Sequence, residues 1–250
     1  MSPADLLAVV DLGSNSFRLE VARLEENRLL SLLYRKETVR LAGGFAPDGT
    51  LTPEMQERAL SALTRFRECL AGVAPENILA VGTHAMRRAS QNAAFLCAAE
   101  RALGVPIEII SGEREASFAF SGAVRSLPYS AEERLVVDIG GGSTEMASGR
   151  GTTIGRSASY PVGCVSASIG FFPDGRITPD RQKAALEHAM TVLGDAAKTF
   201  PEASSSEAYM TAGTFRAVVE TCRNLGWTKE EVRLEHIEEL IARLLRSKGR

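Results

Sequence analysis

Cysteine and histidine are scarce in this sequence, and neither residue type is clustered. The four cysteines are widely separated, at Cys69, Cys97, Cys164 and Cys222, and the three histidines are also scattered. Zinc sites need ligands at short, regular spacings, and disulfide-rich folds need many cysteines close together. We therefore expect small buried or half-buried thiols, without a zinc centre or a disulfide framework.

Long apolar runs and an excess of charge of one sign are also missing. No apolar stretch approaches the roughly 20 residues that span a bilayer, and no basic-then-apolar signal segment precedes the first expected strand. A formal net charge of -2 argues against a nucleic-acid footprint over the whole surface, although a local basic cleft is compatible with it. We expect a cytoplasmic protein without nucleic-acid or membrane partners.

The most informative stretch that is present runs from Leu135 to Glu145 and reads Leu-Val-Val-Asp-Ile-Gly-Gly-Gly-Ser-Thr-Glu. An apolar run of this kind predicts a buried strand, and the glycines that follow let backbone N–H groups approach an anion closely. Asp138 stands at the strand end, where a carboxylate can hold a hydrated Mg²⁺. A structural alternative is a tight strand–turn–strand whose glycines serve geometry alone.

The same pattern occurs near the N-terminus, which weakens that alternative. Residues 8–18 again give an apolar run, an acid at Asp11, a glycine at Gly13 and small hydroxyl residues. Two such turns indicate a duplicated phosphate-binding unit. Facing each other across a cleft, they would clamp a polyphosphate from both sides. Arg18 follows the first turn and is either a phosphate-binding fork or an exposed strand arginine.

Two further segments carry charge at expected helix starts. Arg87 and Arg88 follow a buried strand, where a helix N-terminus and a guanidinium would both attract phosphate; we expect one of the two to face a cleft. Glu113 and Glu115 open a later helix. Acids there are favourable against the helix dipole alone, or one of them is a general base aimed at a water beside phosphorus.

The chain is long enough for two domains of ordinary size. A polar connector with a proline, residues 126–134, marks the boundary that we predict, giving domains 1–125 and 126–250. Helices are expected at about 53–70, 84–103, 113–125, 179–200 and 234–245, with a strand at 105–110 and a turn at 161–165.

Together these segments resemble the exopolyphosphatase / guanosine pentaphosphate phosphatase (Ppx/GppA) family. The resemblance spans nearly the whole chain and rests on four blocks in the same order, with weaker support at Gly163 and Gly213. The four blocks are Asp11-Leu-Gly-Ser-Asn-Ser-Phe-Arg18, Thr83-His-Ala-Met-Arg87, Ile110-Ser-Gly-Glu-Arg-Glu115-Ala116 and Asp138-Ile-Gly-Gly-Gly-Ser-Thr-Glu145.

The resemblance implies an actin-like (ASKHA, ribonuclease H-like) α/β fold of two domains with an interdomain cleft. It also implies Mg²⁺-dependent hydrolysis of a terminal phosphoanhydride, in inorganic polyphosphate or at the 5′ end of guanosine pentaphosphate. Family members continue beyond the position of Arg250, so the second domain is expected to be incomplete at its C-terminus. An uncovered sheet edge favours association, and a homodimer is one candidate assembly.

The family's functional residues match single positions of this chain. Glu115 matches the catalytic glutamate that activates the attacking water, and Asp138 and Glu145 match the acids tied to the metal and the nucleophile. The expected metal ligands are Asp11, Asp138 and Glu145. The expected phosphate-binding residues are Gly13, Ser14, Asn15, Arg18, Arg87, Gly140, Gly141, Gly142 and Ser143.

Three classes of function remain open at this point. An exopolyphosphatase is favoured because all three acids are present and because a chain substrate needs only repeated basic contacts; a guanosine pentaphosphate 5′-phosphatase is the alternative enzyme. The second class is a non-catalytic module that binds polyphosphate or guanosine polyphosphates without turnover. A kinase-like ATPase would share the glycine turns, but the Ser111-Gly-Glu-Arg-Glu115 block argues against it.

Overall fold

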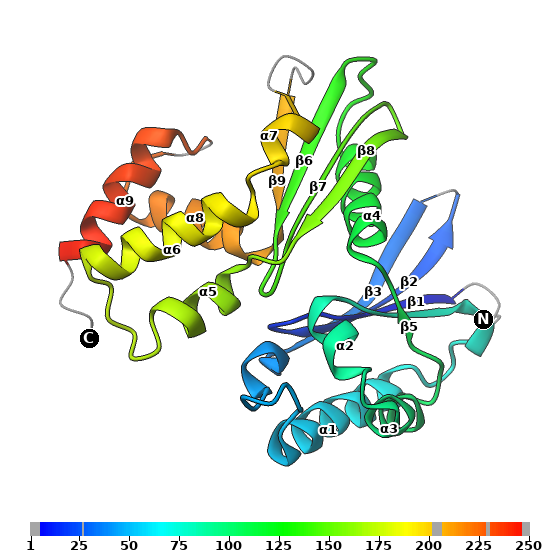
Figure 1. Ribbon diagram of the computed structural model, residues 1–250. Coiled ribbons are helices and arrows are strands. Elements are labelled where there is room, and N and C mark those ends of the chain that lie inside the picture. The colour runs from blue at the N-terminus through cyan, green and yellow to red at the C-terminus, as the bar shows by residue number, and fades with distance from the viewer. Residues whose placement is uncertain (1–5, 27, 202–206, 229–230, 247–250) are drawn as a thin grey trace. The chain divides into compact units, whose positions relative to one another are not determined.

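The chain folds into two compact units, Met1–Ser111 and Gly112–Arg250, each with its own sheet (Figure 1). The computed structural model describes residues 6–26, 28–201, 207–228 and 231–246. The units divide before α4 (Gly112–Arg125), whereas the sequence places the boundary after it. The physical reason is that α4 packs on strands of the second sheet, so it belongs to the second unit.

The first unit is built on a five-stranded sheet with the order β3-β2-β1-β4-β5. The first three strands form an antiparallel meander, and β4 and β5 run parallel to β1. The elements of this unit are β1 (Leu6–Leu12), β2 (Phe17–Glu25), β3 (Arg28–Glu37), η2 (Leu41–Gly44), α1 (Pro53–Cys69), η3 (Pro75–Asn77), β4 (Ile78–Gly82), α2 (His84–Ala89), α3 (Ala93–Leu103) and β5 (Glu108–Ile109).

Burial in the first unit follows the two-residue period of its strands. Ala8, Val10 and Leu12 of β1 are buried, whereas Val9, between Ala8 and Val10, is 47% exposed. The buried face packs against helices, and α1 contributes an apolar stripe that includes Leu63 and Phe66. In Figure 1, α1 and α3 lie side by side under this sheet.

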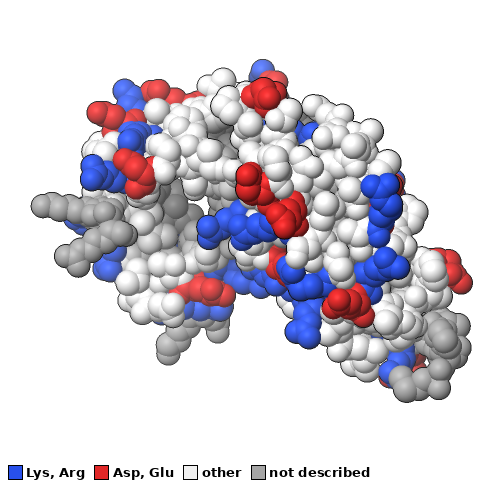
Figure 2. All heavy atoms as spheres, turned by 90° about the horizontal axis from the view of Figure 1, so that it is seen from below, with Lys and Arg blue, Asp and Glu red and all other residues white. Residues whose placement is uncertain are grey.

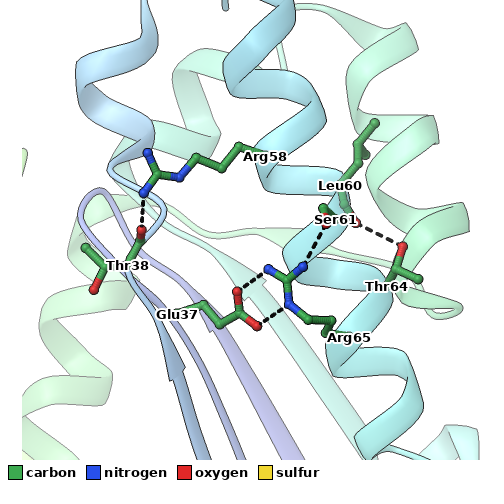
Figure 3. Close-up of polar contacts among 7 residues, drawn as sticks. All are labelled: Glu37, Thr38, Arg58, Leu60, Ser61, Thr64 and Arg65. Atoms are coloured by element: carbon green, nitrogen blue, oxygen red, sulfur yellow. Dashed lines mark hydrogen bonds and ion pairs between the residues drawn. The ribbon is translucent and has the colours of Figure 1, made fainter.

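Polar contacts tie α1 to the end of β3 (Figure 3). The Arg65 guanidinium donates to both carboxylate oxygens of Glu37, with an Nε–Oε1 distance of 2.6 Å, and Nη1 also donates to Ser61 Oγ at 2.7 Å. Arg58 Nη2 donates to the carbonyl oxygen of Thr38 at 2.7 Å. These bonds hold the helix across the edge strand, which has no strand partner on its outer side within the described residues.

The second unit is built on a four-stranded sheet with the order β8-β7-β6-β9, in which β6, β7 and β8 form an antiparallel meander and β9 is parallel to β6. Phe120 of α4 is fully buried and packs with Val136 and Ala147 of the sheet. The elements after α4 are β6 (Glu133–Ile139), β7 (Thr144–Arg150), β8 (Thr153–Tyr160), α5 (Cys164–Phe171), α6 (Pro179–Val192), α7 (Ala196–Thr199), β9 (Glu207–Thr211), α8 (Ala212–Asn224) and α9 (Leu234–Arg246).

Both sheets have the same connectivity over their first four strands: a three-strand meander followed by a strand parallel to the first. The α/β class and the internal duplication expected from the two Asp–Gly turns are therefore confirmed at the level of topology. Within the described residues, no helix is both long and apolar enough to cross a bilayer. Acidic and basic side chains lie close to one another on the face shown in Figure 2.

Four local predictions were wrong. The single helix expected at 84–103 is two helices, because the Asn92 side chain accepts from Ala94 N and Phe95 N and so caps a new helix. The strand expected at 105–110 shrinks to Glu108–Ile109 after Pro106, which has no N–H for a ladder.

The other two lie in the second unit. The helix expected at 179–200 stops at Val192 and resumes as α7 after Gly194, a residue of low helix propensity. The turn expected at 161–165 is shorter than predicted, because α5 already begins at Cys164. This last difference matters for the site, because the start of α5 contacts the glycine turn.

Candidate active site

A row of four polar residues crosses the second sheet at one end. Strand register places Thr211 of β9 beside Asp138 of β6, Asp138 beside Glu145 of β7, and Glu145 beside Ser159 of β8. Directly paired residues share a face of a sheet, so all four side chains project to the same side. The two acids singled out by the sequence therefore lie next to each other between two hydroxyl residues.

Each acid accepts a hydrogen bond from the hydroxyl beside it. Ser159 Oγ donates to Glu145 Oε1 at 2.7 Å, and Thr211 Oγ1 donates to Asp138 Oδ2 at 2.9 Å. Glu145 is only 2% exposed, and Asp138 is half-buried. Because a buried carboxylate is costly without hydrogen-bond donors, these hydroxyls are part of what makes the acidic pair tolerable in the fold.

The glycine turn between β6 and β7 closes on itself. Gly140 N donates to Ser143 O at 2.9 Å, and a Cβ on Gly140 would lie 3.1 Å from that oxygen. A side chain there would crowd the turn, which favours glycine at this position. Ser143, an expected phosphate ligand, is 2% exposed and lies within the turn.

The residue that precedes α5, Gly163, packs closely against this turn. A Cβ on Gly163, which precedes α5, would come within 2.6 Å of Gly141 C and Gly142 N. Real Cβ atoms do not approach backbone this closely, so only glycine permits the contact. The glycine noted at 163 thus serves the approach of a helix to the phosphate turn.

Hydrogen bonds from α5 set the direction of the turn's peptide groups. Cys164 N donates to Gly140 O at 3.0 Å, and Val165 N donates to Gly141 O at 2.8 Å. In a planar trans peptide the C=O and the following N–H point in opposite directions. Because both carbonyls face α5, the N–H groups of Gly141 and Gly142 face the other way, where they could donate to an anion.

Glu115 lies at the same end of the second unit as the acidic pair. It is half-buried in the first turn of α4, whereas Glu113 is exposed. The short connector 126–132 leads from α4 into β6, and α4 packs along β6, β7 and β8, so the helix runs antiparallel to β6 (Figure 1). The N-terminal turn of α4 therefore lies toward the strand end that carries Asp138.

The first unit repeats the strand–turn–strand arrangement, with an arginine at the position that Glu145 occupies in the second unit. Asp11 of β1 pairs in register with Arg18 of β2, as Asp138 pairs with Glu145. Arg18 Nη1 lies 3.2 Å from Asp11 Oδ2. A Cβ on Gly13 would lie 3.0 Å from Ser16 O, which matches the contact of Gly140 with the second turn.

The turn of the first unit is also held through its carbonyl groups. Ala42 N donates to Ser14 O at 3.0 Å, and Arg40 N donates to Asn15 O at 2.8 Å. By the same peptide geometry, the N–H groups of Asn15 and Ser16 face away from the 40–42 segment. Each unit thus offers one glycine turn whose N–H groups share a direction.

The two arginines after β4 differ in their contacts. Arg87 Nη1 donates to Ile110 O at 2.7 Å, so its side chain lies toward the end of β5. The Arg88 guanidinium instead lies over the Phe45 ring, 4.1 Å from the centroid. Burial, together with the charges of both arginines, lowers the pKa of His84, which favours its neutral form.

The acidic pair fits Mg²⁺ by its chemistry. No group of three or more His, Cys, Asp or Glu residues that could hold a metal occurs among the described residues. Mg²⁺ in phosphate-processing sites characteristically uses one or two carboxylates, with water and substrate phosphates as the other ligands. Asp138 and Glu145 satisfy that requirement, while Asp11 is ion-paired with Arg18 and its role as a ligand stays a prediction.

The structure also adds residues that the sequence did not single out. Thr211 and Ser159 hold the acids, and their only sequence signal is a hydroxyl at or near the end of an expected strand. The expected phosphate residues Gly140, Gly141, Gly142 and Ser143 form one turn of the second unit. Gly13, Ser14, Asn15, Arg18 and Arg87 lie at or next to the C-terminal ends of β1 and β4 in the first.

Comparison with known proteins agrees with this architecture. The model of the Ppx/GppA phosphatase family matches residues 20–249. A Haemophilus influenzae protein, provisionally named an exopolyphosphatase, is 34% identical over 242 residues, which cover 97% of this chain and 75% of the relative.

Two solved structures are similar over nearly the whole chain. The PPX-GPPA enzyme of Aquifex aeolicus is 26% identical, with a TM-score of 0.75 over 96% of this chain and 81% of that one. An exopolyphosphatase of Cytophaga hutchinsonii shares the fold, with a TM-score of 0.81 at 24% identity over 97% of this chain and 80% of its own. The fold is the actin-like α/β fold, and the chain belongs to the Ppx/GppA phosphatase family.

Proposed function

We propose that this chain is a Mg²⁺-dependent exopolyphosphatase that releases the terminal phosphate of inorganic polyphosphate. The observation that carries the proposal is the pairing of Asp138 with Glu145 beside a glycine turn whose N–H groups share a direction. The provisional name of the Haemophilus influenzae relative supports polyphosphate as the substrate. A cytoplasmic location and a homodimer remain predictions.

The residues suit what phosphoryl transfer requires. Such reactions ask the protein mainly to position a water in line with phosphorus and to neutralise the phosphate oxygens. The turn N–H groups of Gly141 and Gly142 would donate to those oxygens, and Arg18 and Arg87 supply positive charge in the first unit. Asp138 and Glu145 would hold Mg²⁺, which when bound would neutralise charge on the phosphate.

Glu115 would act as the general base. Its carboxylate accepts a proton from water while the water oxygen forms a bond to the terminal phosphorus. The bond from that phosphorus to the bridging oxygen breaks, and the bridging oxygen leaves with the shortened chain. The proposal needs no covalent intermediate on serine, cysteine or histidine.

The test is phosphate release from long-chain polyphosphate with Mg²⁺, measured for the parent chain, Glu115→Gln and Glu113→Gln. We expect Glu115→Gln to lower kcat by about 10²- to 10⁴-fold, the range for a general base, while polyphosphate binding survives. Glu113→Gln, in the same helical turn but exposed, should keep the parent rate.

The same assay separates the other functions. Faster release from guanosine pentaphosphate than from polyphosphate would replace the proposed substrate. Binding of polyphosphate by the parent without any release would identify a non-catalytic module. Equal rates for Glu115→Gln and the parent would remove Glu115 as the base.

A further inference from the structure

We propose that Ser159 and Thr211 are positioning residues that hold Glu145 and Asp138 in the orientation that binds a divalent cation. This inference rests on the proposed function, because it assigns a role to the groups around the same acidic pair. Neither hydroxyl needs to touch the substrate; each would act through the carboxylate that it holds.

Ser159 directs the two oxygens of Glu145. Its hydroxyl donates to Oε1 at 2.7 Å, while Oε2 lies on the turn side, 3.9 Å from the place that a Cβ on Gly140 would occupy. A glutamate side chain has three torsions, and the bond to Ser159 selects one of its arrangements. The serine thus keeps one oxygen of a 2% exposed acid directed toward the glycine turn.

The side-chain hydrogen bond of Thr211 is unusual for a residue at the start of a helix. It is the residue before α8, where a threonine hydroxyl ordinarily accepts a hydrogen bond from the first turn of its helix. No such capping bond is formed by its side chain, and the hydroxyl instead donates to Asp138 Oδ2 at 2.9 Å. The start of α8 therefore lacks a side-chain cap from Thr211, and Asp138 gains a hydrogen-bond donor.

The first unit shows that the fold does not require these hydroxyls. In the equivalent row, Val81 pairs with Asp11 at the place of Thr211, and Lys36 pairs with Arg18 at the place of Ser159. The same strand order forms there without either hydroxyl. The hydroxyls occur in the unit that carries two adjacent acids, which points to the acids as the reason for them.

The effect of removing the hydroxyls should resemble that of other groups that orient metal ligands. Loss of such a partner characteristically costs about 10- to 100-fold in metal affinity or activity. We expect Ser159→Ala and Thr211→Val to lose that amount. Ser159→Thr and Thr211→Ser keep a hydroxyl on the same strand position and should retain most of the parent's affinity.

The experiment measures Mn²⁺ binding to the full chain by electron paramagnetic resonance, in the absence of polyphosphate. The Mg²⁺ concentration for half-maximal phosphate release and the melting temperature are measured in parallel. Ser148→Ala is the matched control, because Ser148 is fully buried in the same sheet and its hydroxyl donates to Glu133 Oε1 at 3.0 Å, at the opposite end from the acidic pair.

The inference is supported if Ser159→Ala and Thr211→Val lose Mn²⁺ affinity, their conservative partners regain it, and Ser148→Ala loses stability alone. It is overturned if the hydroxyl-free variants bind Mn²⁺ like the parent, or if the parent binds none. A parent that binds Mn²⁺ but releases no phosphate overturns the proposed function, while the binding comparison still decides the inference.

Discussion

Asp138 on β6 lies directly opposite Glu145 on β7, at the paired position that Asp11 and Arg18 occupy on β1 and β2. The two units therefore share a strand–turn–strand device but differ in charge at its second position. An acid facing an arginine forms an ion pair, whereas an acid facing an acid repels it. The cation of the proposed function would offset this repulsion when bound.

Neutralising one member of the acidic pair should stabilise the metal-free chain and abolish turnover. Like charges directly opposite each other in a sheet cost about 0.2–1 kcal/mol, and 1 kcal/mol shifts Tm by about 2–4 °C in a chain of this size. We expect Asp138→Asn and Glu145→Gln to raise Tm by up to about 4 °C with a chelator present. Differential scanning calorimetry measures the change in Tm, and phosphate release measures the loss of turnover.

Magnesium provides the control for this comparison. Because a ligand that binds the folded state stabilises it, Mg²⁺ should raise the Tm of the parent and have a smaller effect on either variant. Lower melting temperatures for both variants without metal would show that the pair does not repel.

Gly163→Ala should separate α5 from the phosphate turn. The new Cβ would overlap Gly141 C and Gly142 N at 2.6 Å, and backbone atoms cannot yield as a side chain can. Overpacking of this kind costs about 1–3 kcal/mol, and displacement of the turn should lower kcat/KM at least tenfold. Chemical denaturation and phosphate release measure the two effects.

Gly170→Ala is the matched control in the same helix. A Cβ on Gly170 would meet no atom within 4 Å, so the change should stabilise α5 by about 0.5–1 kcal/mol through lost chain entropy in the unfolded state. If the two alanine variants behave alike, close packing at Gly163 has no functional role.

Arg87 and Arg88 should differ in their effect on substrate affinity. Charge-assisted hydrogen bonds contribute about 1.5–3 kcal/mol, so loss of a phosphate contact in Arg87→Met should lower kcat/KM by about 10- to 100-fold. Arg88→Met removes a guanidinium that lies over Phe45 and should change kcat/KM little. Steady-state kinetics with polyphosphate measures both variants, and the reverse ranking would exchange the assignments.

The Arg65–Glu37 pair should stabilise the fold in a pH-dependent way. Hydrogen bonds from Arg65 lower the pKa of Glu37 in the folded chain. The contribution is therefore present above the ordinary pKa of glutamate and is lost as the pH falls through the lowered value. Because Arg65 is half-exposed, we expect Arg65→Met to cost about 1 kcal/mol or less at neutral pH, with the difference from the parent vanishing in acid.

Urea denaturation of both chains at descending pH tests this. Arg35→Met serves as the control, because Arg35 is exposed on β3, the strand that carries Glu37, and makes no ion pair among the described residues. A difference between Arg65→Met and the parent that grows toward acid would show that the sign is wrong.

Local patterns in the sequence were enough to predict the glycine turns and their duplication, and they placed Asp138 and Glu145 on either side of one turn. A strand, a short turn and a second strand place Asp138 opposite Glu145 whenever the hairpin forms, because pairing in a hairpin is set by its turn. Helix details were less predictable. The break at Asn92 depends on a side-chain cap that competes with a continuous helix.

The sequence by itself determined the family, through four motifs spread over the chain, and the two Asp–Gly turns, since each turn depends on neighbours within its own hairpin. The tertiary structure alone decided which hydroxyls hold the acids: Ser159 lies 14 residues from Glu145, and Thr211 lies 73 residues from Asp138. It also decided that Arg87 and Arg88 contact different residues, and that Gly163 packs against the glycine turn at Gly141 and Gly142. Such contacts depend on which strands become neighbours and on how closely a helix approaches a turn, and no local period encodes either.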